Sequence, residues 1–398
     1  MKILQALFFP PEQPGGVSSM VPYIQERFLK KGWDMELFSL PKRVRSKGRD
    51  EVQFHTFDWK KYAGNPIVEK YIQTYKDYIW WTKLRLKGTY DLIHAHHPIA
   101  ALAMKELFPD TPVMITVHSS YERELILNGR IRENGPEVEF LTSIYGELED
   151  RLDKIVTVSE SFRVYMSGFI KNGENITVIP NGFDQRRFRP FSHENAVAQL
   201  ICVCRLVPAK GIDTLLEACS HLKRKGVPFV LHLIGDGPIR EELEQMAVDL
   251  GIYEDTIFYG YMLHPEEFMP FFDIFVLPSR AEAFGSVFAE AALCLLALVG
   301  TEVGGIPEQI ENGQSGLLVP VNDSLALVSA LEKLIADPDY RYELARSARE
   351  KAKRSYSLSR VIQQLSKVYR SYKKDDGHDV SASGAEEDDS SEDGEAGV

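Results

Sequence analysis

The residues with the clearest capacity for chemistry are two carboxylates, Glu282 and Glu290, which bracket a turn of small residues. The turn follows an apolar run, 274–277, that is typical of a buried strand. A helix is expected after the turn, and the free amide groups at a helix N-terminus bind anions such as phosphate. Carboxylates accept hydrogen bonds from sugar hydroxyls. The pattern therefore predicts a site for an elongated ligand with phosphate in its middle and hydroxyls at both ends, such as a nucleotide-sugar.

Two cations, Arg205 and Lys210, lie on the loop that follows the predicted strand 199–204. Arginine offers a fork of donors and lysine a point charge, so a pair one loop apart can hold a diphosphate. Isolated basic residues on a loop are commonly no more than solvated. The spacing alone leaves both interpretations of this loop open.

Histidines gather at the ends of two other predicted strands. One strand end carries His94, His96 and His97, and the strand 113–118 ends at His118. Ligands of open α/β sheets bind at the carboxyl ends of the strands, so His118 is predicted to lie in a cleft, with a core histidine as the alternative. A zinc site would need further ligands, and none stands at a suitable spacing nearby, so we expect no bound metal.

A glycine pair, Gly15 and Gly16, follows the first predicted strand. Glycine lets a backbone approach a ligand closely, although a simple tight turn would use the pair as well. The turn lacks the Gly-x-Gly-x-x-Gly pattern with a later acidic residue, which argues against a nicotinamide dehydrogenase.

Apolar runs alternate with amphipathic stretches along the chain, which predicts two doubly wound α/β domains. The charged connection 185–195 separates them, so we expect a first domain over 1–190 and a second over 191–356. An apolar pattern with helical spacing over 358–369 follows. The predicted strands are 3–8, 34–40, 91–94, 113–118, 154–158 and 176–179, then 199–204, 229–234, 256–259, 274–277, 298–300 and 316–319.

The composition, 44% hydrophobic and 26% charged, is that of a globular protein. The last segment, 375–398, carries ten acidic residues and no Lys or Arg, so it is expected to be disordered. Without it the net charge of −12 becomes −2, which disfavours nucleic-acid binding. No apolar run reaches the roughly 18 residues of a membrane span, and the four cysteines suit a reducing, cytoplasmic location.

Segment 70–87 interleaves aromatic residues with Lys and Arg. Such a helix can lie on a membrane surface, or it can be half-buried with its basic side chains reaching solvent. We favour the half-buried helix, so peripheral membrane contact is the alternative.

The stretch 278–290 places Glu282-x7-Glu290 in a Pro-Ser-x-x-Glu-x-Phe-Gly context, and it resembles retaining glycosyltransferases of family 4. These enzymes have the GT-B fold, in which the final helix crosses back to the first domain, as 357–374 is expected to do. The resemblance extends over residues 1–374. Further matching blocks are 180–184 (Pro-Asn-Gly-x-Asp), 304–308 (Gly-Gly-x-Pro-Glu) and 204–211, where Cys204 replaces a glycine of the family.

The resemblance also implies a role for each candidate residue. Glu290 would hold the ribose hydroxyls, Glu282 would hold the transferred sugar, and no metal or cofactor would be needed. The catalytic set would be His118, Glu282, Arg205 and Lys210, the donor-binding set Gly16, Arg205, Lys210, Glu282, Phe284, Gly285, Ser286, Val287 and Glu290, and the acceptor side His96 and His118.

The predicted activity is transfer of a sugar, N-acetylglucosamine or glucose, from a UDP-sugar to an acceptor hydroxyl with retention of configuration. A weaker resemblance, to glycosyltransferases of aminoglycoside-antibiotic assembly, points to a small cyclitol acceptor such as 2-deoxystreptamine. The alternatives are synthesis of lipid-linked sugars or polysaccharides at a membrane surface, a sugar-nucleotide epimerase, and a non-catalytic glycosyltransferase-like subunit.

Overall fold

The computed structural model describes residues 1–10, 16–41, 58–191 and 195–373. Gly15 and the tail 375–398 lie outside these ranges, so the predictions made for them stay predictions.

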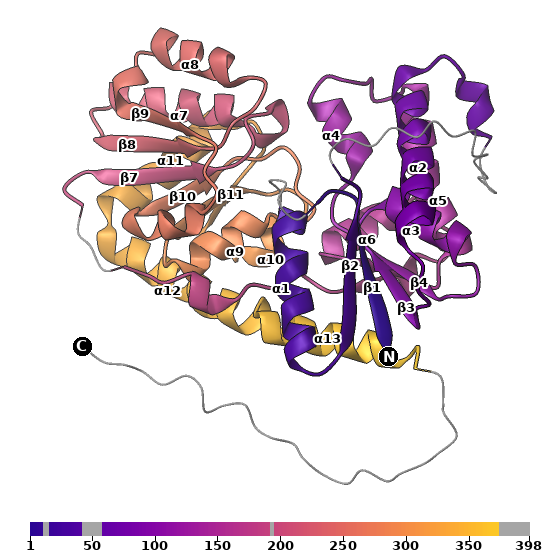
Figure 1. Ribbon diagram of the computed structural model, residues 1–398. Coiled ribbons are helices and arrows are strands. Elements are labelled where there is room, and N and C mark those ends of the chain that lie inside the picture. Colours follow the sequence, from indigo (N-terminus) through magenta and orange to yellow (C-terminus); the bar gives the residue numbers. More distant parts are fainter. Residues whose placement is uncertain (11–15, 42–57, 192–194, 374–398) are drawn as a thin grey trace.

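Within the described residues, two six-stranded parallel sheets form the centres of two α/β domains (Figure 1). Their strand orders are β2-β1-β3-β4-β5-β6 and β12-β11-β10-β7-β8-β9. This arrangement confirms the predicted pair of doubly wound domains. The strands are β1 (Lys2–Leu7), β2 (Asp34–Ser39), β3 (Leu92–Ala95), β4 (Val113–Val117), β5 (Lys154–Thr157), β6 (Thr177–Val178), β7 (Ala198–Val203), β8 (Phe229–Ile234), β9 (Thr256–Gly260), β10 (Ile274–Leu277), β11 (Ala297–Thr301) and β12 (Leu317–Val319).

Small shifts of the strand ends matter for the site. Strand β3 ends at Ala95 and β4 at Val117, so His96 and His118 each lie one position beyond the carboxyl end of a strand. The predicted strand 176–179 is reduced to two residues because it lies at the sheet edge and Pro180, which has no amide hydrogen, follows soon after.

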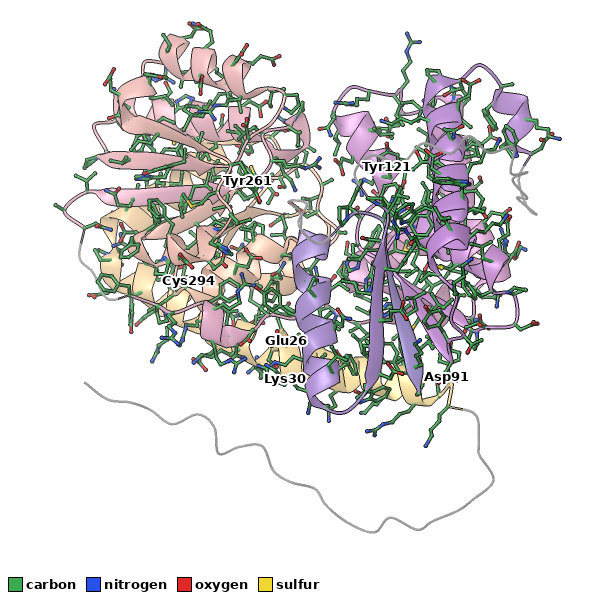
Figure 2. All side chains as sticks on the ribbon, viewed as in Figure 1. Glu26, Lys30, Asp91, Tyr121, Tyr261 and Cys294 are labelled. Carbon is green, nitrogen blue, oxygen red and sulfur yellow. The ribbon has the colours of Figure 1, made fainter. Side chains whose placement is uncertain are left out.

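Helices cover both faces of the N-terminal sheet. Helices α2, α3 and α5 share one apolar core with the sheet, while α1 and α13 pack on its other face. The helices of this domain are α1 (Gly16–Lys30), α2 (Pro66–Arg85), α3 (Pro98–Leu107), α4 (Tyr121–Leu127), α5 (Pro136–Arg151) and α6 (Glu160–Ser167). In Figure 2, Asp91, just before β3, and Tyr121, shortly after β4, mark the amino-terminal and carboxyl-terminal ends of the strands of this sheet.

Helix α2 includes most of the segment 70–87, for which the sequence allowed either a helix on a membrane surface or a half-buried helix. Its tyrosines Tyr71, Tyr75 and Tyr78 are buried in the core, whereas Lys83 and Leu84 are exposed. One face of α2 is therefore part of the domain interior, as a half-buried helix requires. No helix in the described part of the chain is long and apolar enough to cross a bilayer.

The C-terminal sheet is likewise enclosed by helices, which contribute to the large core shared by the two domains. These helices are α7 (Ile212–Arg224), α8 (Arg240–Asp249), α9 (Ser286–Leu293), α10 (Ile306–Gln309), α11 (Ser324–Ala336) and α12 (Pro338–Ser355). Short 3₁₀ turns connect several elements, and η4 (Pro208–Lys210) bears on the site below.

The last helix, α13 (Leu358–Arg370), crosses back beneath the N-terminal domain, as expected (Figure 1). Ser357 caps its first turn by accepting from the amide of Arg360. Its apolar stripe includes Val361, Leu365 and Tyr369, and it packs in the second core with α1 and β1. The final helix thus ties the C-terminal domain to the first sheet.

Direct contacts also join the two domains near the carboxyl ends of the strands. The carboxylate of Glu308 accepts from the amides of Glu160 and Ser161 at 3.0 and 2.7 Å, at the start of α6. Ser159, the N-cap of α6, accepts from the amide of Phe162 and donates to the carbonyl of Ala283 at 2.5 Å. These bonds hold the loop before α9 against the first domain.

Candidate active site

A cavity of about 90 Å³ lies at the junction of the two domains. It is lined on one side by α6 and by the loop and helix that follow β4, and on the other by the loops after β7 and β10. The lining residues are Ser119, Ser120, Arg123, Glu124, Phe162, Arg205, Ala209, Lys210, Ala281, Glu282 and Ala283. Three of the residues predicted to handle the donor, Arg205, Lys210 and Glu282, therefore share one cavity.

The loop before α9 presents backbone amides to this region. Gly285 has a φ of 82°, a left-handed conformation that suits glycine, and the helix begins at Ser286. Among the described residues, none accepts from the amides of Phe284, Gly285, Ser286 or Val287. The side-chain amide of Gln309 donates to the carbonyls of Phe284 and Gly285, the latter at 3.1 Å, and so fixes the loop. The N-terminus of α9 can therefore receive an anion.

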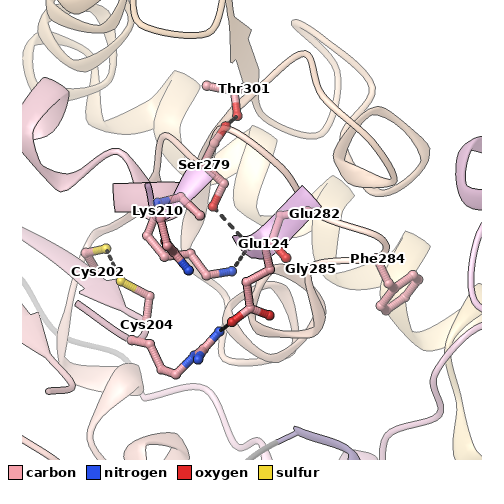
Figure 3. Close-up of polar contacts among 12 residues, drawn as sticks. Glu124, Cys202, Cys204, Lys210, Ser279, Glu282, Phe284, Gly285 and Thr301 are labelled. Atoms are coloured by element: carbon pink, nitrogen blue, oxygen red, sulfur yellow. Dashed lines mark hydrogen bonds and ion pairs between the residues drawn. The ribbon is translucent and has the colours of Figure 1, made fainter. Parts of the chain in front are cut away.

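Lys210 and Glu282 form a half-buried ion pair at the cavity (Figure 3). The Nζ of Lys210 lies 2.5 Å from Oε1 of Glu282, which also accepts from the hydroxyl of Ser279 at 2.9 Å. Their side chains are only 19% and 12% exposed. Burial alone would lower the pKa of Lys210, but the Glu282 carboxylate outweighs burial and raises it. Lys210 is therefore held as a cation.

Arg205 is paired across the domain boundary. Its guanidinium donates to the carboxylate of Glu124 on α4, a contact drawn in Figure 3. The Arg205 side chain is 61% exposed, so water competes for it. Both cations of the predicted diphosphate site are thus matched to carboxylates. Sequence reasoning missed Glu124, because no motif marks an acid that meets its partner from another domain.

Glu290 lies in the second turn of α9 and is half-buried. Burial, together with the nearby carboxylate of Glu266, raises its pKa to about 7, while Arg187 opposes the shift. Arg187 itself is paired with Glu266. The side-chain carboxylate of Glu290 has no hydrogen-bond partner among the described residues. A ribose diol could satisfy this carboxylate.

The two predicted acceptor-side histidines contact each other. The Nε2 of His118 lies 3.1 Å from the Nδ1 of His96, and the Nε2 of His96 lies 2.7 Å from Oε1 of Gln5. Both ring nitrogens of His96 are therefore engaged inside the protein, and its ring offers no free polar atom to an acceptor. By contrast, Nδ1 of His118 is buried without a partner. It is the atom of this pair that could receive a substrate hydroxyl.

Burial also sets the charge state of His118. It lowers the pKa of His118 to about 4, and the nearby side chain of Asn181 opposes part of that shift. No hydrogen bond reaches Nδ1, however, because the Asn181 amide donates to the hydroxyl of Ser286 at 2.9 Å. His118 is therefore neutral at physiological pH and lies beside a residue that contacts the start of α9.

The other predicted residues take distinct positions. Gly16 is the first residue of α1, which places it after β1 at the carboxyl edge of the first sheet. His94 lies within β3 and is bonded to Tyr369 and Thr116, which is a structural environment. His97 caps α3 by accepting from the amide of Ile99 at 3.1 Å. The structure does not test the ligand contacts predicted for Gly16, Glu282 or Glu290.

The architecture defines the class of the molecule, because structures of the GT-B glycosyltransferases superpose on it. Sucrose-phosphate synthase from Thermosynechococcus elongatus matches with a TM-score of 0.76 at 18% identity, over 93% of this chain and 99% of that one. The structure of TarM matches with a TM-score of 0.73 at 13% identity, over 93% and 99% of the two chains. At such low identity these likenesses show the fold.

Sequence relationships then give the family. The family model "Glycosyltransferase Family 4" matches residues 14–187, and "Glycosyl transferases group 1" matches residues 184–354. A D-inositol 3-phosphate glycosyltransferase from Saccharomonospora viridis is 30% identical over 314 residues, which cover 71% of this chain and 70% of that protein. The chain therefore belongs to glycosyltransferase family 4, and it is an enzyme that transfers a sugar to an acceptor.

Two further relatives show the range of the similarity. Glycogen synthase of Mycobacterium tuberculosis is 29% identical over 71% of this chain and 69% of its own length. An alpha-D-kanosaminyltransferase from Streptomyces kanamyceticus is 33% identical over 43% of this chain and 45% of its own.

Proposed function

We propose that this chain transfers a hexose or N-acetylhexosamine from a UDP-sugar to an acceptor hydroxyl, and that the anomeric configuration is retained. One observation carries the proposal. Four backbone amides, at 284–287, have no acceptor among the described residues, and they directly follow the segment 281–283, which lines the cavity between the two domains together with Lys210 and Arg205. That arrangement suits a diphosphate held between a nucleoside and a sugar.

The same groups supply the stabilisation that the reaction needs. As the bond between the anomeric carbon and the phosphate oxygen breaks, negative charge develops on the leaving diphosphate. The amides of the α9 N-terminus and the ammonium of Lys210 are fixed in place before the reaction, so they stabilise this charge without reorganising. Loss of one such group typically lowers kcat on the order of 100–1000-fold.

Retention is supported by the carboxylates that line the cavity. Glu282 is paired with Lys210 and Glu124 with Arg205, the two cations proposed to bind the diphosphate, so both carboxylates lie on the side of the leaving phosphate. A covalent glycosyl intermediate would need a free carboxylate behind the anomeric carbon. We therefore propose a front-face reaction. The acceptor oxygen bonds to the anomeric carbon on the side that the phosphate leaves, and a phosphate oxygen takes the acceptor proton.

The ion pairs must separate when the donor binds. A cavity of about 90 Å³ is too small for a nucleotide-sugar, since pockets for ligands of that size measure roughly 300–1,000 Å³. The diphosphate would displace Glu124 from Arg205 and Glu282 from Lys210. The site would thereby gain both the volume and the two cations.

Relatives support the choice of donor and acceptor class. Structures similar to this one include an Anabaena protein in complex with UDP and glucose, with a TM-score of 0.66 at 19% identity. One relative named above acts on D-inositol 3-phosphate, by its name, which is a small polyhydroxylated ring. We therefore propose a small cyclitol, such as 2-deoxystreptamine, as the acceptor to test first.

The test is saturation-transfer NMR of the purified protein against UDP-, GDP- and ADP-sugars, followed over hours with and without cyclitol acceptors. We expect one donor to bind and to be hydrolysed slowly, and an α-linked product to form from an α-linked donor. A β-linked product would refute retention. Binding of no donor would refute the donor class and favour a non-catalytic subunit, whereas an isomerised donor without transfer would favour an epimerase.

A further inference from the structure

A line of hydrogen bonds runs through the interior of the N-terminal domain from α13 to His118. The side-chain amide of Gln5, on β1, donates to the hydroxyl of Tyr369 at 3.0 Å. The amide oxygen of Gln5 lies 2.7 Å from His96, and His96 lies 3.1 Å from His118. We call Tyr369, Gln5, His96 and His118 the relay. Gln5 and Tyr369 are fully buried and His96 is 7% exposed, so water does not compete for these bonds.

The two imidazoles of the relay are neutral. Burial lowers the pKa of His96 well below its usual value and that of His118 to about 4. A neutral imidazole has one nitrogen that donates and one that accepts. If the hydrogen-bond partner of one ring nitrogen is known to donate or to accept, the nitrogen that carries the proton is therefore known for that ring.

Following the partners along the relay fixes every proton. The Gln5 oxygen can only accept, so Nε2 of His96 carries a hydrogen and donates to it. The Nδ1 of His96 is then the accepting nitrogen, so Nε2 of His118 must donate to it. What remains is Nδ1 of His118, which has no hydrogen, no partner and almost no exposure.

The far end of the relay is consistent with this assignment. The hydroxyl of Tyr369 accepts from Gln5, which leaves its single hydrogen for Nδ1 of His94 at 2.7 Å. Nε2 of His94 then carries a hydrogen and donates to the hydroxyl of Thr116 at 2.8 Å. Each nitrogen and oxygen along this path has a donor matched to an acceptor. Reversing the relay would require the amide of Gln5, the hydroxyl of Tyr369 and the rings of His94, His96 and His118 to change together.

We propose that Tyr369, Gln5 and His96 are positioning residues, which hold His118 in the tautomer that presents an unprotonated Nδ1 to a substrate hydroxyl. The last helix would then do more than join the domains, because its Tyr369 is the origin of the relay. The expected effect of this tautomer on catalysis rests on the proposed glycosyltransferase function. The tautomer of His118 itself does not depend on that function.

The tautomer can be observed directly. In full-length protein labelled with ¹⁵N-histidine, two-bond ¹H–¹⁵N spectra distinguish protonated from unprotonated ring nitrogens. The resonances of His118 are assigned by their loss in His118→Gln. We expect Nε2 to carry the proton and Nδ1 to be bare. A protonated Nδ1 in the wild-type protein would overturn the proposal, whatever the enzyme's activity.

Variants test whether the relay sets that tautomer. Gln5→Leu removes both bonds of Gln5, so His118 should populate both tautomers. With the donor and acceptor identified, kcat should fall about 10–100-fold, the range for outer residues that orient a site, while the donor KM stays within twofold. Gln5→Glu keeps an oxygen toward His96 and should restore the tautomer. An unchanged tautomer and an unchanged kcat in Gln5→Leu would overturn the proposal.

A matched pair at α13 provides the control. Tyr369→Phe removes the relay hydroxyl but keeps the ring that packs against Phe28 and Trp33. Tyr372→Phe removes a neighbouring hydroxyl, which donates to the carbonyl of Asp153 at 3.2 Å outside the relay. Only Tyr369→Phe should change the tautomer of His118. Equal effects of the two changes would show that α13 has only a structural role. If no donor is turned over by any variant, the proposed function fails, but the NMR result still decides the relay.

Discussion

Binding of the nucleotide-sugar should tighten as the pH rises from 6 to 8, through the ionisation of one side chain. Glu290 is placed to accept from the ribose hydroxyls, and a carboxylate does so best when it is ionised. Its pKa is raised from the ordinary value of 4.5 to about 7 by burial and by Glu266. In the free protein, the ionised form therefore becomes dominant only above neutral pH.

The size of the effect follows from that pKa. With a pKa of about 7, roughly a tenth of the Glu290 carboxyl groups are ionised at pH 6 and roughly nine tenths at pH 8. If the ribose binds the ionised form alone, the donor Kd falls about tenfold over this range. Hydrogen bonds from the ribose stabilise the ionised form, so binding lowers the pKa of Glu290 and releases a proton below pH 7.

Titration calorimetry with the UDP-sugar at pH 6 and pH 8 measures this change, and two buffers of different ionisation enthalpy report the proton release. The diphosphate of a nucleotide-sugar is esterified at both ends, so it does not titrate in this range. Glu290→Gln is the matched control. This variant removes the ionisable carboxyl group of Glu290 and leaves the neighbouring pair of Glu266 and Arg187 in place. Equal pH dependence in the two proteins would refute the assignment of Glu290 to the ribose.

The same ionisation should affect stability with the opposite sign. Because the folded pKa of Glu290 lies above the unfolded one, the folded state binds this proton more tightly. The resulting stabilisation is full below pH 4.5 and is lost as the pH rises through about 7. The shift corresponds to at most about 3 kcal/mol, and less because the carboxyl is partly exposed. Glu290→Gln should therefore raise the Tm more at pH 8 than at pH 5 in thermal unfolding.

Three further predictions concern the loops around the cavity. Glu124→Gln should release Arg205 for the diphosphate and tighten the donor Kd about two- to fivefold at low salt by calorimetry; a weaker Kd would contradict the exchange. Lys210→Met should lower the free energy of unfolding by about 3 kcal/mol, because Glu282 is left buried without its cation, and adding Glu282→Gln should recover part of the loss; a fully stable single variant in denaturant titration would oppose this. Gly304→Ala should abolish turnover, because Gly304 has a φ of +55° and its Cβ would lie 1.7 Å from the carbonyl oxygen of Glu282; normal turnover would show that the loop tolerates displacement.

Much of the fold could be predicted because parallel buried strands are continuous apolar runs, and such runs are local in sequence. The strand 274–277 was predicted with its observed bounds for this reason. Glu282 and Glu290 were also recognised locally, since one lies on the loop before α9 and the other within that helix. The predicted ends of several strands differ from the observed ends by one residue, because the residue at which a strand ends depends on its pairing with the neighbouring strand.

The hydrogen-bond and ion-pair partners of the site residues could not be predicted from the sequence. Arg205 is separated from Glu124 by 81 positions, and Gln5 from Tyr369 by 364. Nothing in either local sequence indicates which side chain will arrive opposite. The interpretation of His96 suffered from this directly. The resemblance put His96 on the acceptor side, but Gln5, from the neighbouring strand β1, is bonded to its Nε2.

The paired cations suggest how phosphate and sugar recognition are coupled. Glu282 is predicted to hold the transferred sugar, yet Oε1 of its carboxylate is bound to Lys210 and Ser279. When a diphosphate takes Lys210, that oxygen is released and can accept from sugar hydroxyls. A free sugar would have to compete with the ammonium of Lys210, and a nucleotide without its sugar would leave a half-buried carboxylate unpaired. On this reasoning the intact nucleotide-sugar should bind more tightly than its separate halves would predict, because each half completes the site for the other.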